Sequence, residues 1–259
     1  MAAASEFVNV SVDQGVMEIS LQRPERKNAL THDMYTALSA AMDEAEATPS
    51  VRVMLLTGTQ DCFTAGNDML DFLNNPPKGD NSPVMIFLRK LVEISKPLVA
   101  AVNGPAVGVG TTLLFHCDLV FVARGARLQM PFTSLGLCPE AGSSMLLPMI
   151  VGHQRAAELL MQSKVIDGEK AERIGIANAV FDDNDYLVRA REESRKLAAQ
   201  PAAAVRLTKQ LLKAPYIDQL RAHMKEEGDL FGERLESPEA REAMSAFVEK
   251  RKPDFSQFD

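Results

Sequence analysis

The sequence predicts an α/β fold with a mostly parallel sheet, followed by a helical region. Between residues 51 and 123, short apolar runs typical of buried strands alternate with segments whose apolar side chains have helical spacing. This alternation is typical of βαβ units, in which consecutive strands run parallel. After about residue 183 the pattern becomes helical and rich in charge. The sequence therefore separates a sheet-containing part from a helical carboxyl-terminal part.

The first elements are expected to be a β-hairpin and a helix. Residues 7–12 and 16–21 alternate apolar and polar side chains on either side of Asp13-Gln14-Gly15, which indicates two antiparallel strands joined by a turn. Thr31 is suited to cap the helix that follows, which should extend to about Ala47.

Two strand–helix units are expected next. The buried strand at 51–56 leads to a helix over 84–94, and the buried strand at 97–102 leads to a helix over 108–115. One further strand is expected at 118–123. The carboxyl-terminal helices are expected over residues 186–199, 202–212 and 217–231.

Composition and charge exclude several classes of protein. The 28 Lys and Arg residues against 35 Asp and Glu residues give a formal charge of −7, and without a basic block a nucleic-acid partner is not expected. The three cysteines match no zinc spacing and are expected to be reduced thiols. We expect no membrane span and a cytoplasmic location, because no apolar run reaches spanning length and neither a signal peptide nor a peroxisomal tripeptide is recognisable.

Three segments contain groups suited to chemistry. The first, residues 62–69, places small residues after a buried strand, where backbone amides can donate to an oxyanion. The second, residues 103–112, is a glycine-bearing loop that opens a helix but lacks the full dinucleotide fingerprint, so NAD binding is not expected. The third, residues 130–144, surrounds Glu140 with apolar residues, where desolvation would raise the pKa of its carboxyl.

Each segment by itself is also compatible with a structural role, which for the first and third segments is the reading that the local sequence favours. Asp68 can cap the helical turn that follows the first segment, and the glycines of the second can serve close packing of a helix on a strand. Glu140 can lie in the first turn of a helix and stabilise its dipole. A functional interpretation therefore depends on the three segments taken together.

Together and in this order, the three segments resemble the crotonase (enoyl-CoA hydratase/isomerase) superfamily. The similarity covers nearly the whole chain and includes residues 23–30, 96–104, 168–180 and 247–255. It implies a ClpP/crotonase-like spiral of ββα units in residues 1–195 and a helical trimerisation region in residues 196–259. A homotrimer or hexamer is the assembly that the resemblance implies.

The resemblance also implies an acyl-CoA substrate whose thioester oxygen is held in an oxyanion hole of two backbone N–H groups. By motif position, these groups belong to Ala65 and Val109. No metal is expected, and no cofactor beyond the coenzyme A of the substrate. The residues that the resemblance places near the substrate or its coenzyme A are Arg26, Lys27, Ala29, Ala65, Gly66, Asn67, Asp68, Met69, Gly108 and Phe132.

Two positions favour an isomerase over a hydratase. Hydratases of the superfamily add water with two glutamates, and at these positions this chain has Thr112 and Phe132. The third segment instead resembles the Δ3,Δ2-enoyl-CoA isomerases, with Glu140 as the single catalytic glutamate. We therefore predict that Glu140 carries a proton from C2 to C4 of a 3-enoyl-CoA and produces trans-2-enoyl-CoA in fatty-acid β-oxidation. The alternatives that stay open are acyl-CoA hydrolysis, hydration, and a non-catalytic module that binds coenzyme A or a protein.

Overall fold

The computed structural model describes residues 5–59, 61–75, 79 and 81–258. Its strands are β1 (Val8–Asp13), β2 (Val16–Leu21), β3 (Val53–Thr57), β4 (Leu98–Val102), β5 (Pro105–Val107), β6 (Leu119–Ala123), β7 (Arg127–Gln129), β8 (Ile166–Asp167) and β9 (Ala179–Phe181). Its α-helices are α1 (His32–Ala47), α2 (Met69–Asn74), α3 (Pro83–Glu93), α4 (Val109–Thr112), α5 (Ser143–Val151), α6 (His153–Met161), α7 (Gly168–Arg173), α8 (Tyr186–Ala198), α9 (Ala202–Lys213), α10 (Ile217–Leu235) and α11 (Pro238–Val248). Short 3-10 turns are η1 (Pro24–Arg26), η2 (Leu113–His116) and η3 (Thr133–Leu135).

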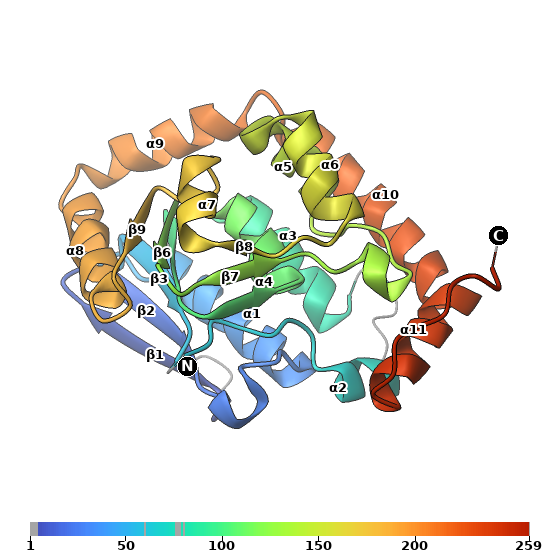
Figure 1. Ribbon diagram of the computed structural model, residues 1–259. Coiled ribbons are helices and arrows are strands. Elements are labelled where there is room, and N and C mark those ends of the chain that lie inside the picture. The colour runs from blue at the N-terminus through green and yellow to red at the C-terminus, as the bar shows by residue number, and fades with distance from the viewer. Residues whose placement is uncertain (1–4, 60, 76–78, 80, 259) are drawn as a thin grey trace.

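The strands form two sheets, which Figure 1 shows with helices around them. The larger sheet has the order β1-β2-β3-β4-β6-β9; its first pair is antiparallel and every later pair is parallel. The smaller sheet has the order β5-β7-β8. The prediction of an α/β fold with a mostly parallel sheet is confirmed.

Apolar side chains cover both faces of the larger sheet. Along β3, Met54 and Leu56 join the large core with α1 and α3, whereas Val53 and Leu55 face the opposite side and pack with α8. All five residues of β3 are buried, as a strand enclosed on both faces requires. The β3 position in the sheet therefore explains why its sequence is continuously apolar rather than alternating.

Local signals placed the first elements correctly. The predicted hairpin is β1–β2, and its turn uses positive φ at Gln14 (49°) and Gly15 (81°). Thr31 caps α1 as predicted, because its side chain accepts a hydrogen bond from the Met34 N–H at 3.3 Å. Both features depend on neighbouring residues alone, and the sequence could therefore predict them.

The structure differs from the prediction at several short elements and at the long helix α10. The helix expected over 108–115 is the α-helical turn α4, continued by η2 in 3-10 geometry. Strands β5, β7, β8 and β9 are two or three residues long, too short to show a period in the sequence. Helix α10 extends beyond its predicted end to Leu235, and α11 follows it.

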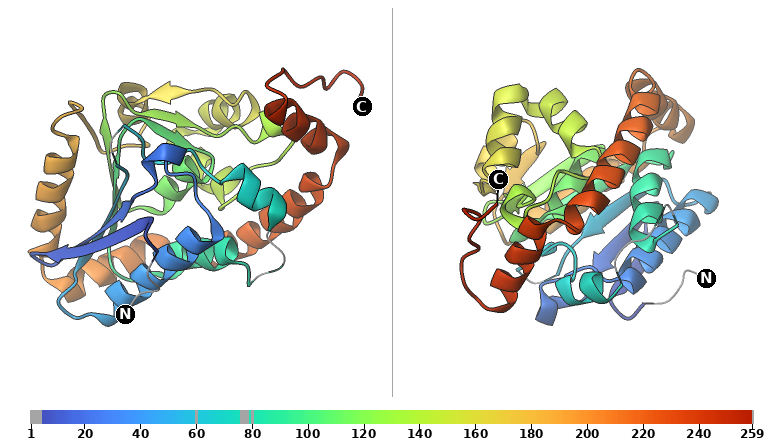
Figure 2. Two further views of the ribbon diagram at one scale, coloured as in Figure 1. Left: turned by 90° about the horizontal axis from the view of Figure 1, so that it is seen from below. Right: turned by 90° about the vertical axis from the view of Figure 1, so that its right-hand side faces the viewer.

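The carboxyl-terminal helices lead away from the sheet and return to the third segment. Helix α8 packs on the larger sheet and ends at Ala198, so the predicted domain boundary at residue 195 falls within this helix. Helix α9 then crosses toward α5 and α6, and α10 runs past α3 (Figures 1 and 2). Within the described ranges, no helix combines the length and the apolar character needed to cross a membrane.

Candidate active site

Glu140 lies in a tight turn just before α5. The next two residues, Ala141 and Gly142, have left-handed φ angles of 58° and 71°, and the Glu140 carbonyl accepts the Ser143 N–H at 3.0 Å. Glu140 is therefore outside the first helical turn, and the amides at the start of α5 bind another carboxylate, that of Glu227. The structural alternative, in which Glu140 stabilises the helix dipole, is wrong for this reason.

The surroundings of the Glu140 carboxyl bring its pKa close to neutral pH, where the group can both accept and donate a proton. Burial raises its pKa to about 7, and the negative charge of Glu227 acts in the same direction. The Thr112 hydroxyl opposes this by donating a hydrogen bond to Glu140 Oε1, which favours the ionised form. Thr112 is one of the two residues that the family resemblance places where hydratases have glutamates, and in this structure its hydroxyl contacts the carboxyl of Glu140.

A cavity of about 500 Å³ opens beside Glu140. Helices α3 and α10 form much of its wall, with Asn67 from the first segment, Phe72 from α2, and Glu140 and Ala141 from the third segment. Apolar side chains predominate in the wall: Phe72, Val84, Met85, Leu88, Val92, Met224, Phe231 and Leu235. A cavity of this size and character suits an acyl chain, and the Glu140 carboxyl stands at its side.

The first two segments run side by side next to this cavity. Thr64 and Ala106 form a parallel bridge, in which the Val107 N–H donates to the Thr64 carbonyl at 3.0 Å. A Cβ on Gly66 would lie 2.7 Å from the Val107 carbonyl oxygen, so only glycine allows this approach. The structure thus brings the two predicted oxyanion-hole loops together.

The backbone amides of these loops differ in whether they are engaged. The Ala65 N–H, one of the two predicted donors, already donates to the Lys27 carbonyl at 2.9 Å. The Val109 N–H stands at the start of α4, and neither it nor the Asn67 N–H has a hydrogen-bond partner within the described part of the chain. The prediction for Ala65 is therefore corrected: pairing with Lys27, a contact between distant segments, occupies its amide.

Several other predicted substrate contacts have structural partners. Asp68 caps α2 and pairs with Arg23 at 2.6 Å, and this hydrogen bond helps to lower the pKa of Asp68 against the opposing effect of burial. Phe132 is buried and packs edge-on against Phe231 of α10, with ring centroids 6.4 Å apart. Of the remaining predicted residues, Arg26 and Lys27 are exposed, and the Ala29 carbonyl accepts a hydrogen bond from Arg23. Met69 opens α2, and Gly108 precedes α4 with a φ of 56°.

The structure also adds residues that the motifs did not indicate. Tyr35 of α1 is buried, and its hydroxyl donates to Asn67 Oδ1 at 2.5 Å. Burial raises the pKa of Tyr35, and the charge of Glu140 adds to this effect. Glu227 of α10 reaches the Glu140 turn. Tyr35 and Glu227 belong to helices that the sequence predicted, but no local pattern indicates that these two side chains face the site.

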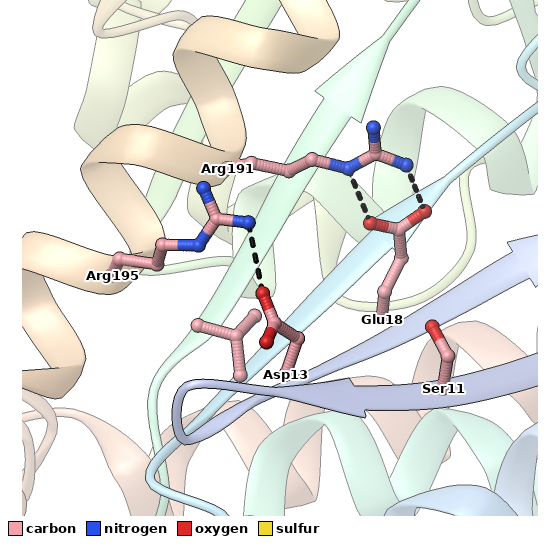
Figure 3. A pocket seen from close by; sticks show the side chains of 6 residues that line it. Ser11, Asp13, Glu18, Arg191 and Arg195 are labelled. Carbon is pink, nitrogen blue, oxygen red and sulfur yellow. Dashed lines mark hydrogen bonds and ion pairs between the residues drawn. The ribbon is translucent and has the colours of Figure 1, made fainter.

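A second hollow, of about 220 Å³, lies on the α8 side of the larger sheet (Figure 3). Its two arginines are already neutralised: Arg191 forms two bonds of 2.7 Å with Glu18, and Arg195 pairs with Asp13 at 3.0 Å. The hollow therefore offers no uncompensated charge to an anionic ligand. In the parts of the chain that the structure describes, no group of three or more His, Cys, Asp or Glu side chains could hold a metal ion.

Comparison with known proteins agrees with this arrangement. The family model described as enoyl-CoA hydratase/isomerase matches residues 11–258. The 1,2-epoxyphenylacetyl-CoA isomerase of Escherichia coli (strain K12) is 34% identical over 97% of this chain and 98% of its own length. The human enoyl-CoA delta isomerase 2 is 31% identical over 95% of this chain and 64% of its own length. Relatives of similar identity are named probable enoyl-CoA hydratases.

A solved structure supports the same assignment. The structure of Pseudomonas aeruginosa OdaA superposes with a TM-score of 0.92 at 52% sequence identity, covering 94% of this chain and 99% of that one. The expected crotonase fold with its helical carboxyl-terminal region is thereby confirmed. The chain is an enzyme that belongs to the enoyl-CoA hydratase/isomerase family.

Proposed function

We propose that this enzyme is a Δ3,Δ2-enoyl-CoA isomerase that acts in the β-oxidation of unsaturated fatty acids. The observation that carries the proposal is the buried carboxyl of Glu140, with a pKa of about 7 and a hydrogen bond from Thr112 at a position where hydratases have a glutamate. The second such position is the buried Phe132, which cannot activate water.

The proposed reaction needs only a base that takes and returns one proton. The Glu140 carboxylate removes a proton from C2 of the 3-enoyl-CoA, and the electron pair moves onto the thioester oxygen to form a dienolate. The protonated Glu140 then delivers the proton to C4, and the double bond ends between C2 and C3. No electrons leave the substrate and no water is added, so this chemistry requires neither a redox cofactor nor a metal.

We propose that the N–H groups of Asn67 and Val109 form the oxyanion hole. Asn67 lines the cavity and Val109 lies on the adjoining loop; both N–H groups are free of other partners among the described residues, whereas the Ala65 N–H is engaged by Lys27. Fixed amides that face the thioester oxygen stabilise the dienolate where its charge develops. The loop that opens α4 adds the favourable end of a helix dipole, although α4 itself is short.

The direct test is product identity. Purified enzyme is incubated with trans-3-hexenoyl-CoA, and the products are separated and identified. Formation of trans-2-hexenoyl-CoA is the expected result. Failure to convert trans-3-hexenoyl-CoA, together with hydration of supplied trans-2-hexenoyl-CoA to 3-hydroxyhexanoyl-CoA, would favour a hydratase. Release of free coenzyme A would favour a hydrolase, and coenzyme A binding without turnover of either substrate would favour a non-catalytic module. Each of these three outcomes contradicts the proposal.

The pH dependence of the reaction should follow the ionisation of Glu140. Only the carboxylate can accept the C2 proton, so kcat/KM is expected to be low in acid and to rise to a plateau as pH increases through about 7. The Thr112 hydroxyl favours the carboxylate, and Thr112→Val should therefore move the inflection to higher pH. Steady-state rates between pH 5 and pH 9 measure both curves. An inflection that stays in place in Thr112→Val would show that the hydroxyl does not act on the titrating group.

We further propose that the enzyme assembles as a homotrimer or a dimer of trimers through its carboxyl-terminal helices. Helix α9 exposes Leu207, Leu211 and Leu212, with 53%, 64% and 69% of their surfaces accessible. Leu211→Glu should therefore reduce the particle mass measured by light scattering, because burying a charge in an apolar contact is costly. Gln210→Glu, a change at another exposed position of the same helix, should keep the wild-type mass. A wild-type mass near that of one 28.3 kDa chain would contradict the proposed assembly.

A further inference from the structure

Helix α10 contributes a buried carboxylate that the proposed reaction does not use. Glu227 is only 5% exposed. Its Oε2 accepts the Gly142 N–H at 2.5 Å, and its Oε1 accepts the Ser144 N–H at 2.9 Å and the Ser144 hydroxyl at 2.5 Å. Both oxygens are thus bound to the segment that directly follows Glu140.

His223 completes this cluster from the preceding turn of α10. Its Nε2 lies 2.7 Å from Ser144 Oγ and 3.5 Å from Glu227 Oε1. A serine hydroxyl has one hydrogen, and here it points to Glu227, so the His223 ring donates to Ser144. The hydrogen bonds to Ser144 consequently orient the side chains of Glu227 and His223 at the amino-terminal end of α5.

The turn between Glu140 and α5 needs support from outside. Ala141 has a φ of 58°, which is unfavourable for a residue with a Cβ, and Gly142 follows with 71°. On one side, His116 lies with Nε2 2.7 Å from the Ala141 carbonyl oxygen; burial lowers the pKa of His116 to about 4, so the neutral ring donates this bond. On the other side stands Glu227. Two elements from distant parts of the chain therefore hold the turn at a carbonyl and at two amides.

Helix α10 also fits closely against the turn. A Cβ on Gly142 would lie 2.5 Å from Leu220 Cδ1 and 3.1 Å from Met224 Cγ. Met224 also lines the cavity beside Glu140. A shift of α10 would therefore move the turn and one wall of the cavity together.

We propose that Glu227 is a positioning residue for Glu140: its carboxylate fixes the turn that presents the Glu140 carboxyl to the cavity. The reaction that this placement serves rests on the isomerase function proposed above, but the placement of Glu140 can be measured without turnover. Glu227 touches no reacting atom in this scheme and acts through the backbone of Gly142 and Ser144.

The negative charge of Glu227 also affects the pKa of Glu140, and this effect can be measured separately from the placement of the turn. Burial has the largest effect on the pKa of Glu140, and the negative charge of Glu227 raises that pKa further. The polar and titratable groups near the Glu140 turn come from several elements: Thr112 from α4, Tyr35 from α1, His116 from η2, His223 from α10, and Cys138 from the same loop. Charged residues of α3 and α10 also line the cavity beside Glu140, namely Arg89, Glu93, Arg221, Lys225 and Asp229. Replacing Glu227 by glutamine changes one charge and leaves all of these side chains in place.

The test compares Glu227→Gln with Glu233→Gln, which removes the same charge from an exposed position on the same helix. The ionisation of Glu140 is followed by carboxyl infrared difference spectra, with Glu140→Gln used to assign the band. The kcat and KM for trans-3-hexenoyl-CoA are measured in parallel. A glutamine has one acceptor oxygen, so one of the two amides loses its partner and meets an N–H donor instead.

In Glu227→Gln we expect a lower pKa for Glu140 and a kcat reduced on the order of 100-fold with KM little changed, as for a reactive group displaced by about 1 Å. Glu233→Gln should match the wild type in both measurements. Glu227→Asp, which keeps the charge and shortens the side chain, should leave the Glu140 pKa nearer the wild-type value; it also serves as the test variant where Glu227→Gln does not fold.

A folded Glu227 variant that differs from wild type only in thermal stability, with unchanged Glu140 titration and kcat, would overturn the proposal and leave Glu227 a helix cap. A wild type that does not convert 3-hexenoyl-CoA would contradict the proposed function instead. In that case the infrared titration still decides whether Glu227 governs the state of Glu140.

Discussion

Glu140→Gln is expected to lower kcat for the conversion of trans-3-hexenoyl-CoA by about 10²- to 10⁴-fold, the range typical of a general acid–base group. Glutamine has nearly the shape of glutamate and can still accept the Thr112 hydrogen bond, but it cannot take a proton from C2. KM should change little, because the apolar wall of the cavity is unaltered. Initial rates at pH 8, where the wild-type carboxyl is mostly ionised, measure the effect.

Two controls make the Glu140 result specific. Glu233→Gln makes the same chemical change at an exposed position of α10 and should keep the wild-type rate. Coenzyme A binding and the thermal unfolding midpoint of Glu140→Gln should show a folded protein. A folded Glu140→Gln enzyme with a wild-type rate would exclude Glu140 as the proton carrier, whatever the product.

Gly66→Ala is expected to reduce kcat by about 10²- to 10³-fold, the loss typical of one oxyanion-hole donor. Gly66 has a φ of 88°, and a methyl group there would approach the Val107 carbonyl oxygen to 2.7 Å. The segment that contains Asn67 would have to move away from the second loop, which would separate the two N–H groups of the proposed oxyanion hole. Steady-state kinetics with 3-hexenoyl-CoA measure this loss.

Gly175→Ala is the matched control for backbone strain. Gly175 has nearly the same φ, 89°, but a Cβ there would meet no atom closer than 3.8 Å. Both variants should lose stability because alanine disfavours positive φ, and only Gly66→Ala should lose its kcat. Equal activity of the two variants would show that the contact between the first and second loops is not needed for catalysis.

Much of the fold could be predicted because its signals are local. The turn after Asp13 and the Thr31 cap depend on residues that are adjacent in the sequence. Strands β3 and β4 can be recognised because each is a continuous apolar run. Strands β5 and β7 could not be recognised in this way. They have three residues each and exist because they pair with one another, so their stability comes from hydrogen bonds between segments.

The candidate site likewise has some features that the sequence determines and others that only the tertiary structure determines. The sequence by itself determined that Glu140 follows a proline in an apolar segment, and the family resemblance indicated that Thr112 and Phe132 stand where hydratases have glutamates. Only the tertiary structure decided that the Ala65 N–H is engaged by Lys27, that the Asn67 N–H meets no partner among the described residues, and that Glu227 of α10 binds the Glu140 turn. The physical reason is that a side chain's identity is local, whereas the pairing of an amide and the desolvation of a carboxyl depend on whichever distant segment packs against them.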